Sequence, residues 1–250
     1  MTTNDAAPSD AAPRDAAPFD AAPFDAELMA AVSELGGAMR GLVDASVSTT
    51  VGAQELLAVA ETVRAATARL AVSRRPASQL PALDDPIAFR RVYSPVTGVG
   101  SAIAPPLVIR RHGDEVVAEV TLGLAYEGPP SYLHGGMSAL LMDQLLGAAA
   151  IAAGLWGMTA HLELDYRGPV PLDTPLVLRA RVTENAGRKS VIGGTIALAE
   201  APERVLVEAR GVFVTPRPDQ AEAYFGSITD ASGQHRPPGR PTDATAVQRD

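Results

Sequence analysis

The sequence predicts an α+β fold in which an antiparallel sheet wraps around one long apolar helix. The segment from Gly135 to about Ala153 is apolar nearly all round except for one carboxylate, Asp143, and such a helix must be enclosed by other elements. Two segments with strand-like alternation precede it and four follow. Short Gly- and Pro-containing connections between the late strands favour antiparallel neighbours.

The composition fits one ordinary domain with extensions. The chain has 250 residues, 46% of them hydrophobic, and a net charge of −8. A nucleic-acid partner would need a basic stripe, which this sequence lacks. The absence of cysteine excludes disulfides, thiolate metal sites and a cysteine nucleophile, and no His, Asp and Glu set has metal-ligand spacing, so no metal and no cofactor are expected.

The start of the chain lacks the pattern of a signal peptide. The start is acidic and rich in Ala and Pro rather than basic and then apolar, so we expect a cytoplasmic protein without a signal peptide. The uncharged stretch from Leu145 to Ala160 contains several glycines and is bracketed by Asp143 and His161. It is therefore better interpreted as a buried helix running into a strand than as a membrane span.

The N-terminal part divides into a tail and two helices. Residues 1–25 repeat Asp-Ala-Ala-Pro four times and predict a disordered tail, with a docking arm as the alternative. Residues 26–75 predict a helical hairpin that packs on the main domain or in an oligomer. Its apolar residues recur three and four apart: Leu28, Val32, Leu35, Met39, Leu42, then Leu56, Val59, Val63, Ala66 and Leu70.

The main domain is expected over residues 107–216, after a proline-containing linker and irregular lead-in over 76–106. Its strands are predicted at Leu107–Ile109, Val116–Leu122, Gly157–Tyr166, Pro175–Thr183, Lys189–Leu198 and Arg204–Thr215. Residues 217–250 are rich in Pro, Gly and polar residues and predict a mostly disordered tail, whose first part Tyr224 and Phe225 could attach to the body.

The start of the long helix is a candidate reaction site. Helix N-termini leave backbone N–H groups unpaired and partly positive, and Gly135-Gly136 would let a carbonyl that becomes an oxyanion approach them closely. Asp143 lies in an apolar run, where a carboxylate is costly unless paired or hydrogen-bonded. Taken singly, a Gly-Gly pair is often only a tight turn, and a mid-helix Asp is often a structural carboxylate.

Several motifs together resemble a known family. The run Gly128-Pro129-Pro130-Ser131-Tyr132-Leu133-His134-Gly135-Gly136 is followed by Asp143, then by Met158-Thr159-Ala160, then by Leu164-Asp165-Tyr166-Arg167-Gly168-Pro169-Val170-Pro171. In their order and spacing these motifs resemble the hotdog-fold acyl-CoA thioesterases of the PaaI/THEM4-like group, in the 4HBT superfamily. The resemblance covers about Leu107 to Thr215.

The resemblance implies a hotdog fold, an acyl-CoA substrate and a homodimer or homotetramer with active sites at the subunit interface. It makes Asp143 the general base or nucleophile, and the Gly135 N–H, with Gly136 adjacent, the group that polarises the thioester carbonyl. His134 would shape the turn and bond to substrate. Thr159 would orient the attacking water or Asp143.

Further substrate contacts are expected outside this set. Some relatives carry an Asn where this chain has Gly128, which leaves open what replaces that contact. Arg167, Arg188 and Lys189 could meet the coenzyme's phosphates, although a solvated hairpin tip is the favoured interpretation of the last two. Met142 could line an acyl pocket or simply pack in the core. His161, two residues beyond Thr159, is expected to share its strand face.

Three functions compete at this point. The first is an acyl-CoA thioesterase. The second is a non-catalytic acyl-CoA-binding or regulatory protein on the same fold, favoured only by the extra helical hairpin. The third is a hotdog dehydratase or hydratase, which needs a histidine and an acid poised together over the substrate.

Overall fold

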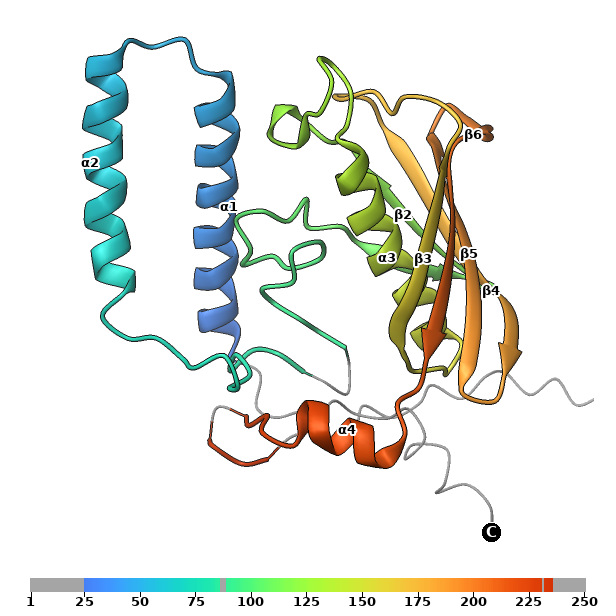
Figure 1. The fold of residues 1–250 in the computed structure, drawn as a ribbon. Helices are drawn as coiled ribbons and strands as arrows, with labels where there is room; N and C mark the ends of the chain where they lie inside the picture. The colour runs from blue at the N-terminus through green and yellow to red at the C-terminus, as the bar shows by residue number, and fades with distance from the viewer. Residues whose placement is uncertain (1–24, 86–88, 231, 236–250) are drawn as a thin grey trace, which may run out of the picture.

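A computed structural model of the chain describes residues 25–85, 89–230 and 232–235 (Figure 1). The predicted N-terminal tail, except Asp25, and residues 231 and 236–250 of the predicted C-terminal tail lie outside these residues. The described elements are α1 (Ala26–Ser48), α2 (Ala53–Leu70), β1 (Ile109–His112), β2 (Glu115–Val120), a 3-10 turn (Leu124–Tyr126), α3 (Gly135–Ala152), β3 (Met158–Tyr166), β4 (Leu176–Ala186), β5 (Lys189–Leu198), β6 (Ala201–Val214) and α4 (Pro218–Phe225).

One six-stranded sheet forms the body of the domain. Its order is β1-β2-β4-β5-β6-β3, and every neighbouring pair is antiparallel. The sheet curves around α3, while the other helices lie outside that layer (Figure 1). The predicted α+β architecture, with an antiparallel sheet around one central helix, is confirmed. Strand β3 follows α3 directly in sequence and lies at one edge of the sheet.

Helix α3 is held by the inner face of the sheet. Leu141, Leu145 and Leu146 are fully buried in the same core cluster as Ile192 and Ile196 of β5. A Cβ on Gly194 would lie 2.6 Å from the Met142 Cε atom of α3 and 2.8 Å from the Arg179 carbonyl oxygen of β4, so a larger residue here would displace Met142 and press on the β4 backbone. By length and composition α3 could cross a membrane, as no other described helix could, but in this fold it is the core helix.

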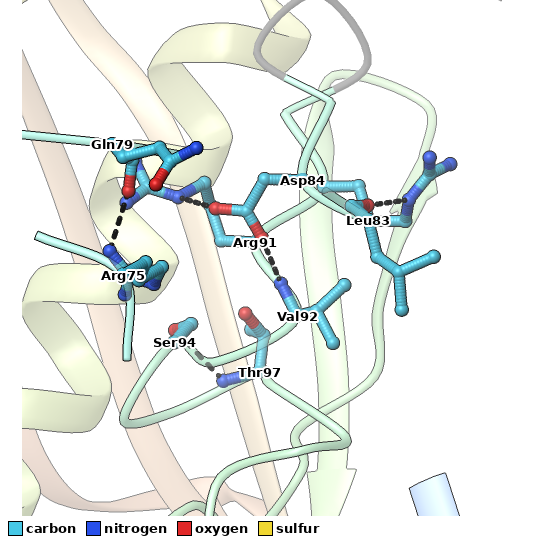
Figure 2. Close-up of polar contacts among 9 residues, drawn as sticks. Arg75, Gln79, Leu83, Asp84, Arg91, Val92, Ser94 and Thr97 are labelled. Atoms are coloured by element: carbon cyan, nitrogen blue, oxygen red, sulfur yellow. Dashed lines mark hydrogen bonds and ion pairs between the residues drawn. The ribbon is translucent and has the colours of Figure 1, made fainter. Parts of the chain in front are cut away.

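The described residues of the lead-in, 76–85 and 89–106, form turns and isolated bridges, and a buried carboxylate organises them. The Asp84 side chain is 2% exposed and accepts hydrogen bonds from Arg91 Nε at 2.7 Å and from the Val92 N–H at 2.8 Å (Figure 2). Nearby, the Ser94 hydroxyl accepts from the Thr97 N–H. The segment is therefore an ordered wall rather than a simple linker.

The two N-terminal helices differ in how they are packed. Helix α1 lies directly on the lead-in: Gly36 is buried against the backbone at Val99, and Arg40 Nη1 donates to the carbonyl oxygens of Val99 and Ser101, both at 2.8 Å. Helix α2 is the outermost element (Figure 1) and has no buried residue. The predicted hairpin thus consists of one docked and one undocked helix.

Two details differ from the sequence prediction. The first strand runs over Ile109–His112 rather than Leu107–Ile109, because the Leu107 N–H donates to the Val96 carbonyl in the lead-in while the β1–β2 ladder extends to the turn at Gly113. The predicted C-terminal tail begins with a helix, α4. Phe225 at its end packs edge-on against Trp156, with ring centroids 6.1 Å apart, and this contact stabilises a helix too short to be recognised by periodicity.

Candidate active site

The first turn of α3 presents one unused backbone donor. His134 is the N-cap residue, and its Nδ1 accepts a hydrogen bond from the Gly136 N–H at 3.0 Å. The Met137 N–H donates to the His134 carbonyl oxygen at 2.9 Å. Among the described residues the Gly135 N–H has no acceptor, so it is available to a ligand oxygen at the positive end of the helix.

The turn before α3 is shaped by Gly128 and Tyr126. The Gly128 N–H donates to the Tyr132 carbonyl, and a Cβ on Gly128 would lie 2.7 Å from the His134 Cα. Gly128 therefore acts through close backbone approach, and no side chain stands where some relatives carry Asn. The Tyr126 carbonyl accepts from the His134 N–H, and burial raises the pKa of the Tyr126 phenol, an effect that Arg40 partly offsets.

Tyr166 is a functional candidate that the sequence prediction missed. Its hydroxyl donates to the Gly135 carbonyl oxygen at 2.8 Å, so the peptide between Gly135 and Gly136 is restrained at its oxygen by Tyr166 and at its N–H by His134. One feature of the sequence could have indicated it: Tyr166 ends a strand that immediately follows the helix, so antiparallel packing returns it to the helix start.

The carboxylate of Asp143 is paired with a hydroxyl. Thr159 Oγ1 donates to Asp143 Oδ1 at 2.8 Å. Asp143 is half-buried, and no cation forms a salt bridge with it among the described residues. One hydroxyl leaves most of the carboxylate's acceptor capacity open to a water or substrate.

A β-bulge makes this contact possible. Strand β3 pairs Thr159 with Phe213 and His161 with Val212, so Ala160 is an extra residue in the ladder. One face of β6 carries the core residues Phe213, Ala209 and Val207. Thr159 pairs with Phe213, and Tyr166 pairs with Val207. Thr159 and Tyr166 therefore share the α3-facing side, and the expectation that His161 shares the face of Thr159 is wrong.

The three predicted phosphate contacts lie in two places. Arg167 pairs with Asp165 at 3.3 Å and with Glu208 at 3.2 Å. Arg188 Nη1 donates to the Thr215 carbonyl, and Lys189 is exposed beside Val214, which in turn pairs with Met158. Lys189 is thus two strands, about 10 Å, from the Thr159 end of β3, whereas Arg167 lies beyond the other end.

Of the two interpretations of Met142, core packing is the one that the structure supports, because its side chain is fully buried against the sheet. On the other side of α3 the described residues line two adjoining open cavities, with volumes of about 680 Å³ and 180 Å³. Within the described part of the chain no group of three or more His, Cys, Asp or Glu residues could hold a metal ion.

Comparison with known proteins places these features in a family. The family model of the thioesterase superfamily matches residues 131–210, which include the α3 start, Asp143, Thr159 and Tyr166. A solved crystal structure of a thioesterase superfamily protein is 37% identical, with a TM-score of 0.64, and the match covers 77% of this chain and 97% of that one.

Curated relatives match over shorter stretches. Acyl-coenzyme A thioesterase THEM4 of Mus musculus is 32% identical over 98 residues, 39% of this chain and 42% of the relative. Acyl-coenzyme A thioesterase THEM5 of Homo sapiens is 28% identical over 92 residues, 37% of each chain. The chain therefore spans less than half the length of these relatives. With its antiparallel sheet wrapped round α3 in the hotdog manner, the chain belongs to the thioesterase superfamily.

Proposed function

We propose that this protein hydrolyses an acyl-CoA thioester to the free acid and coenzyme A. The observation that carries the proposal is the 2.8 Å hydrogen bond from Thr159 to Asp143, a half-buried carboxylate on an otherwise apolar helix. The names of the relatives above, acyl-coenzyme A thioesterases, support the choice of substrate.

The chemistry divides between the two parts of the site. The Gly135 N–H would donate to the thioester carbonyl oxygen and stabilise the charge that develops on it. Asp143 would remove a proton from the attacking water, or add to the carbonyl carbon itself and be released by water afterwards. The C–S bond then breaks, and the coenzyme leaves as a thiolate that takes up a proton. Thr159 holds the carboxylate in place for either route.

One chain alone does not bring these parts together. Gly135 and Asp143 are eight residues apart on α3, which is about 12 Å along the helix axis. A carbonyl bonded to the Gly135 N–H could not also lie within about 3 Å of the attacking group at Asp143 of the same chain. The site is therefore proposed to be completed by a second copy.

The edge strand β3 offers the geometry for that assembly. No described strand pairs with its outer edge, and Thr159 and Tyr166 lie near its two ends. Antiparallel pairing of two β3 strands about a two-fold axis between Leu162 and Glu163 would place Thr159 of one copy opposite Tyr166 of the other. Each Asp143 would then approach the Gly135 of the second copy, giving two identical sites in a homodimer.

The dehydratase alternative fits the described residues less well. His134 uses Nδ1 to cap α3, and Asp143 lies nine residues further along the helix, about 13 Å away. Within one chain the two side chains are therefore not poised together over one substrate atom. In the proposed dimer His134 of one copy would approach Asp143 of the other, and there thiol release separates hydrolysis from hydration. Acyl-CoA binding without hydrolysis remains the function to be separated from catalysis by experiment.

The test is thiol release from an acyl-CoA panel graded in chain length and aromaticity, with Asp143→Asn beside wild type. The chain has no cysteine, so a thiol reagent reports only coenzyme A. Asp143→Asn should lower kcat by about 100-fold or more, with circular dichroism and sedimentation unchanged. Asp114→Asn, in the exposed β1–β2 turn, is the matched control. Near-normal turnover in Asp143→Asn would reject the mechanism, and tight binding without thiol release in wild type would favour the binding protein.

A further inference from the structure

The smaller of the two cavities lies on the face of α3 that carries Asp143. It is lined by Gly147, one turn after Asp143, and by Gly157, two residues before Thr159. The two cavities share Phe89, Arg91 and Ile151 in their linings, so they adjoin in the space beside α3.

The lining of this space is mainly apolar. From α3 it includes Ala148, Ile151 and Ala152, and from the lead-in and β1–β2 it includes Val92, Leu107 and Val116. Met29 of α1 closes one side. The larger cavity has a volume of about 680 Å³, which lies within the range of small-molecule sites, about 300–1,000 Å³.

We propose that this space holds the acyl chain of the substrate, and that the protein therefore prefers medium to long apolar acyl groups. The inference rests on the proposed function for the identity of the ligand. In this proposal α1 and the lead-in, which lie outside the strands of the sheet, supply the wall of the acyl site. Asp84, by fixing Arg91 and Val92 (Figure 2), holds that wall in place.

Two measurements test this proposal, a kinetic one and a binding one that does not depend on catalysis. Ala148→Phe should fill the space and lower kcat/KM for dodecanoyl-CoA by about tenfold or more while leaving acetyl-CoA nearly unchanged, whereas Ala148→Ser should keep the wild-type preference. Trp156, the only tryptophan of the chain, lines the smaller cavity, so its fluorescence should respond to dodecanoate in wild type and not in Ala148→Phe.

The outcomes are distinguishable. An unchanged chain-length preference in an active Ala148→Phe enzyme, or an unchanged Trp156 response to dodecanoate in that variant, would overturn the acyl site. Absence of thiol release from every acyl-CoA would reject the proposed function, and the fluorescence titration would then still decide whether the cavity binds an acyl chain.

A second inference concerns α2. An 18-residue helix with no buried residue and no extensive contact to another element lacks the tertiary packing that usually stabilises a helix of this length. Yet α2 carries an apolar stripe whose large side chains are exposed, namely Leu56, Val59, Val63 and Leu70.

The pattern of α2 is self-complementary when the helix is paired antiparallel with itself. Leu56 and Leu70 lie seven residues on either side of Val63, so a two-fold axis near Val63 would match the stripe with its own copy. Glu55 and Arg69 lie on the same side of that stripe, and the axis would bring Glu55 of one copy to Arg69 of the other. We infer that α2 packs against α2 of a second copy of this chain.

Because the chain has no cysteine, single-cysteine variants report on this contact directly. Val63→Cys should form a disulfide-linked dimer under mild oxidation, since the two sulfurs would meet at the axis. Ala65→Cys, about 200° around the helix, should not. Glu55→Arg should lower the yield of the Val63→Cys dimer several-fold, and the added change Arg69→Glu should restore it.

Equal cross-linking from Val63→Cys and Ala65→Cys, or none from either, would overturn the α2 contact. Failure of the charge reversal to restore the yield would overturn the antiparallel arrangement. This test is independent of the β3 dimer, because disulfide formation reports whether two α2 helices meet at Val63 and not only whether the protein is a dimer.

Discussion

The hydroxyl of Tyr166 donates to the carbonyl oxygen of Gly135 at 2.8 Å, which ties the last residue of the edge strand to the first residue of the central helix. Together with the His134 cap, this bond fixes the peptide that follows the free Gly135 N–H. An oxyanion donor stabilises a transition state only if it is held in position beforehand.

Removing that restraint should slow turnover. We expect Tyr166→Phe to lower kcat by about tenfold, because a small displacement of the donor costs transition-state stabilisation, with KM changing little. Steady-state thiol release measures both constants. Tyr224→Phe, on the exposed surface of α4, should behave as wild type, and equal kcat values for the two variants would exclude a positioning role for Tyr166.

The hydroxyl of Thr159 should matter through Asp143. Thr159→Val keeps the shape and the β-branching but removes the donor, and we expect a fall in kcat of up to about tenfold, the worth of one hydrogen bond of about 1 kcal/mol. Thr159→Ser should retain most of the activity. If Val and Ser proved equally active, the hydrogen bond would have no catalytic consequence.

The close contact between α3 and β5 predicts a stability effect at Gly194. In Gly194→Ala the new methyl would meet Met142 Cε at 2.6 Å and the Arg179 carbonyl oxygen at 2.8 Å, so we expect a loss of about 1–3 kcal/mol in the free energy of unfolding. Urea denaturation measures it. Gly193→Ala, whose Cβ would meet only Thr183 Cγ2 at 3.3 Å, should cost less; the opposite order would contradict the packing.

The buried carboxylate of Asp84 should control the order of the lead-in. Asp84→Ala leaves the Val92 N–H and Arg91 without their acceptor, and we expect about 1–3 kcal/mol of destabilisation. Hydrogen exchange should rise over residues 89–99 and stay unchanged in β4 to β6. Asp114→Ala in the exposed turn serves as control, and uniform exchange across the domain would show that Asp84 supports the whole fold instead.

The parts of the fold that depend on local patterning were predictable. Helix α3 and strand β5 follow from periodicity, and Asp143 and the Gly135 helix start follow from the cost of a carboxylate and the chemistry of a helix end. Contacts set by distant residues were not predictable: Arg167 is engaged by Glu208, 41 residues away, and α4 depends on its ring contact with Trp156.

The extra residue at Ala160 has a consequence for how β3 can vary. Thr159 and Tyr166 are an odd number of residues apart, and in a regular strand they would point to opposite faces. The extra residue shifts the alternation by one position, so Thr159 faces the same side of the sheet as Leu162, Leu164 and Tyr166. Deleting Ala160 would leave Thr159 facing α3 in a straighter strand, whereas inserting a residue between Leu162 and Tyr166 would turn one of the two active-site ends away from the helix.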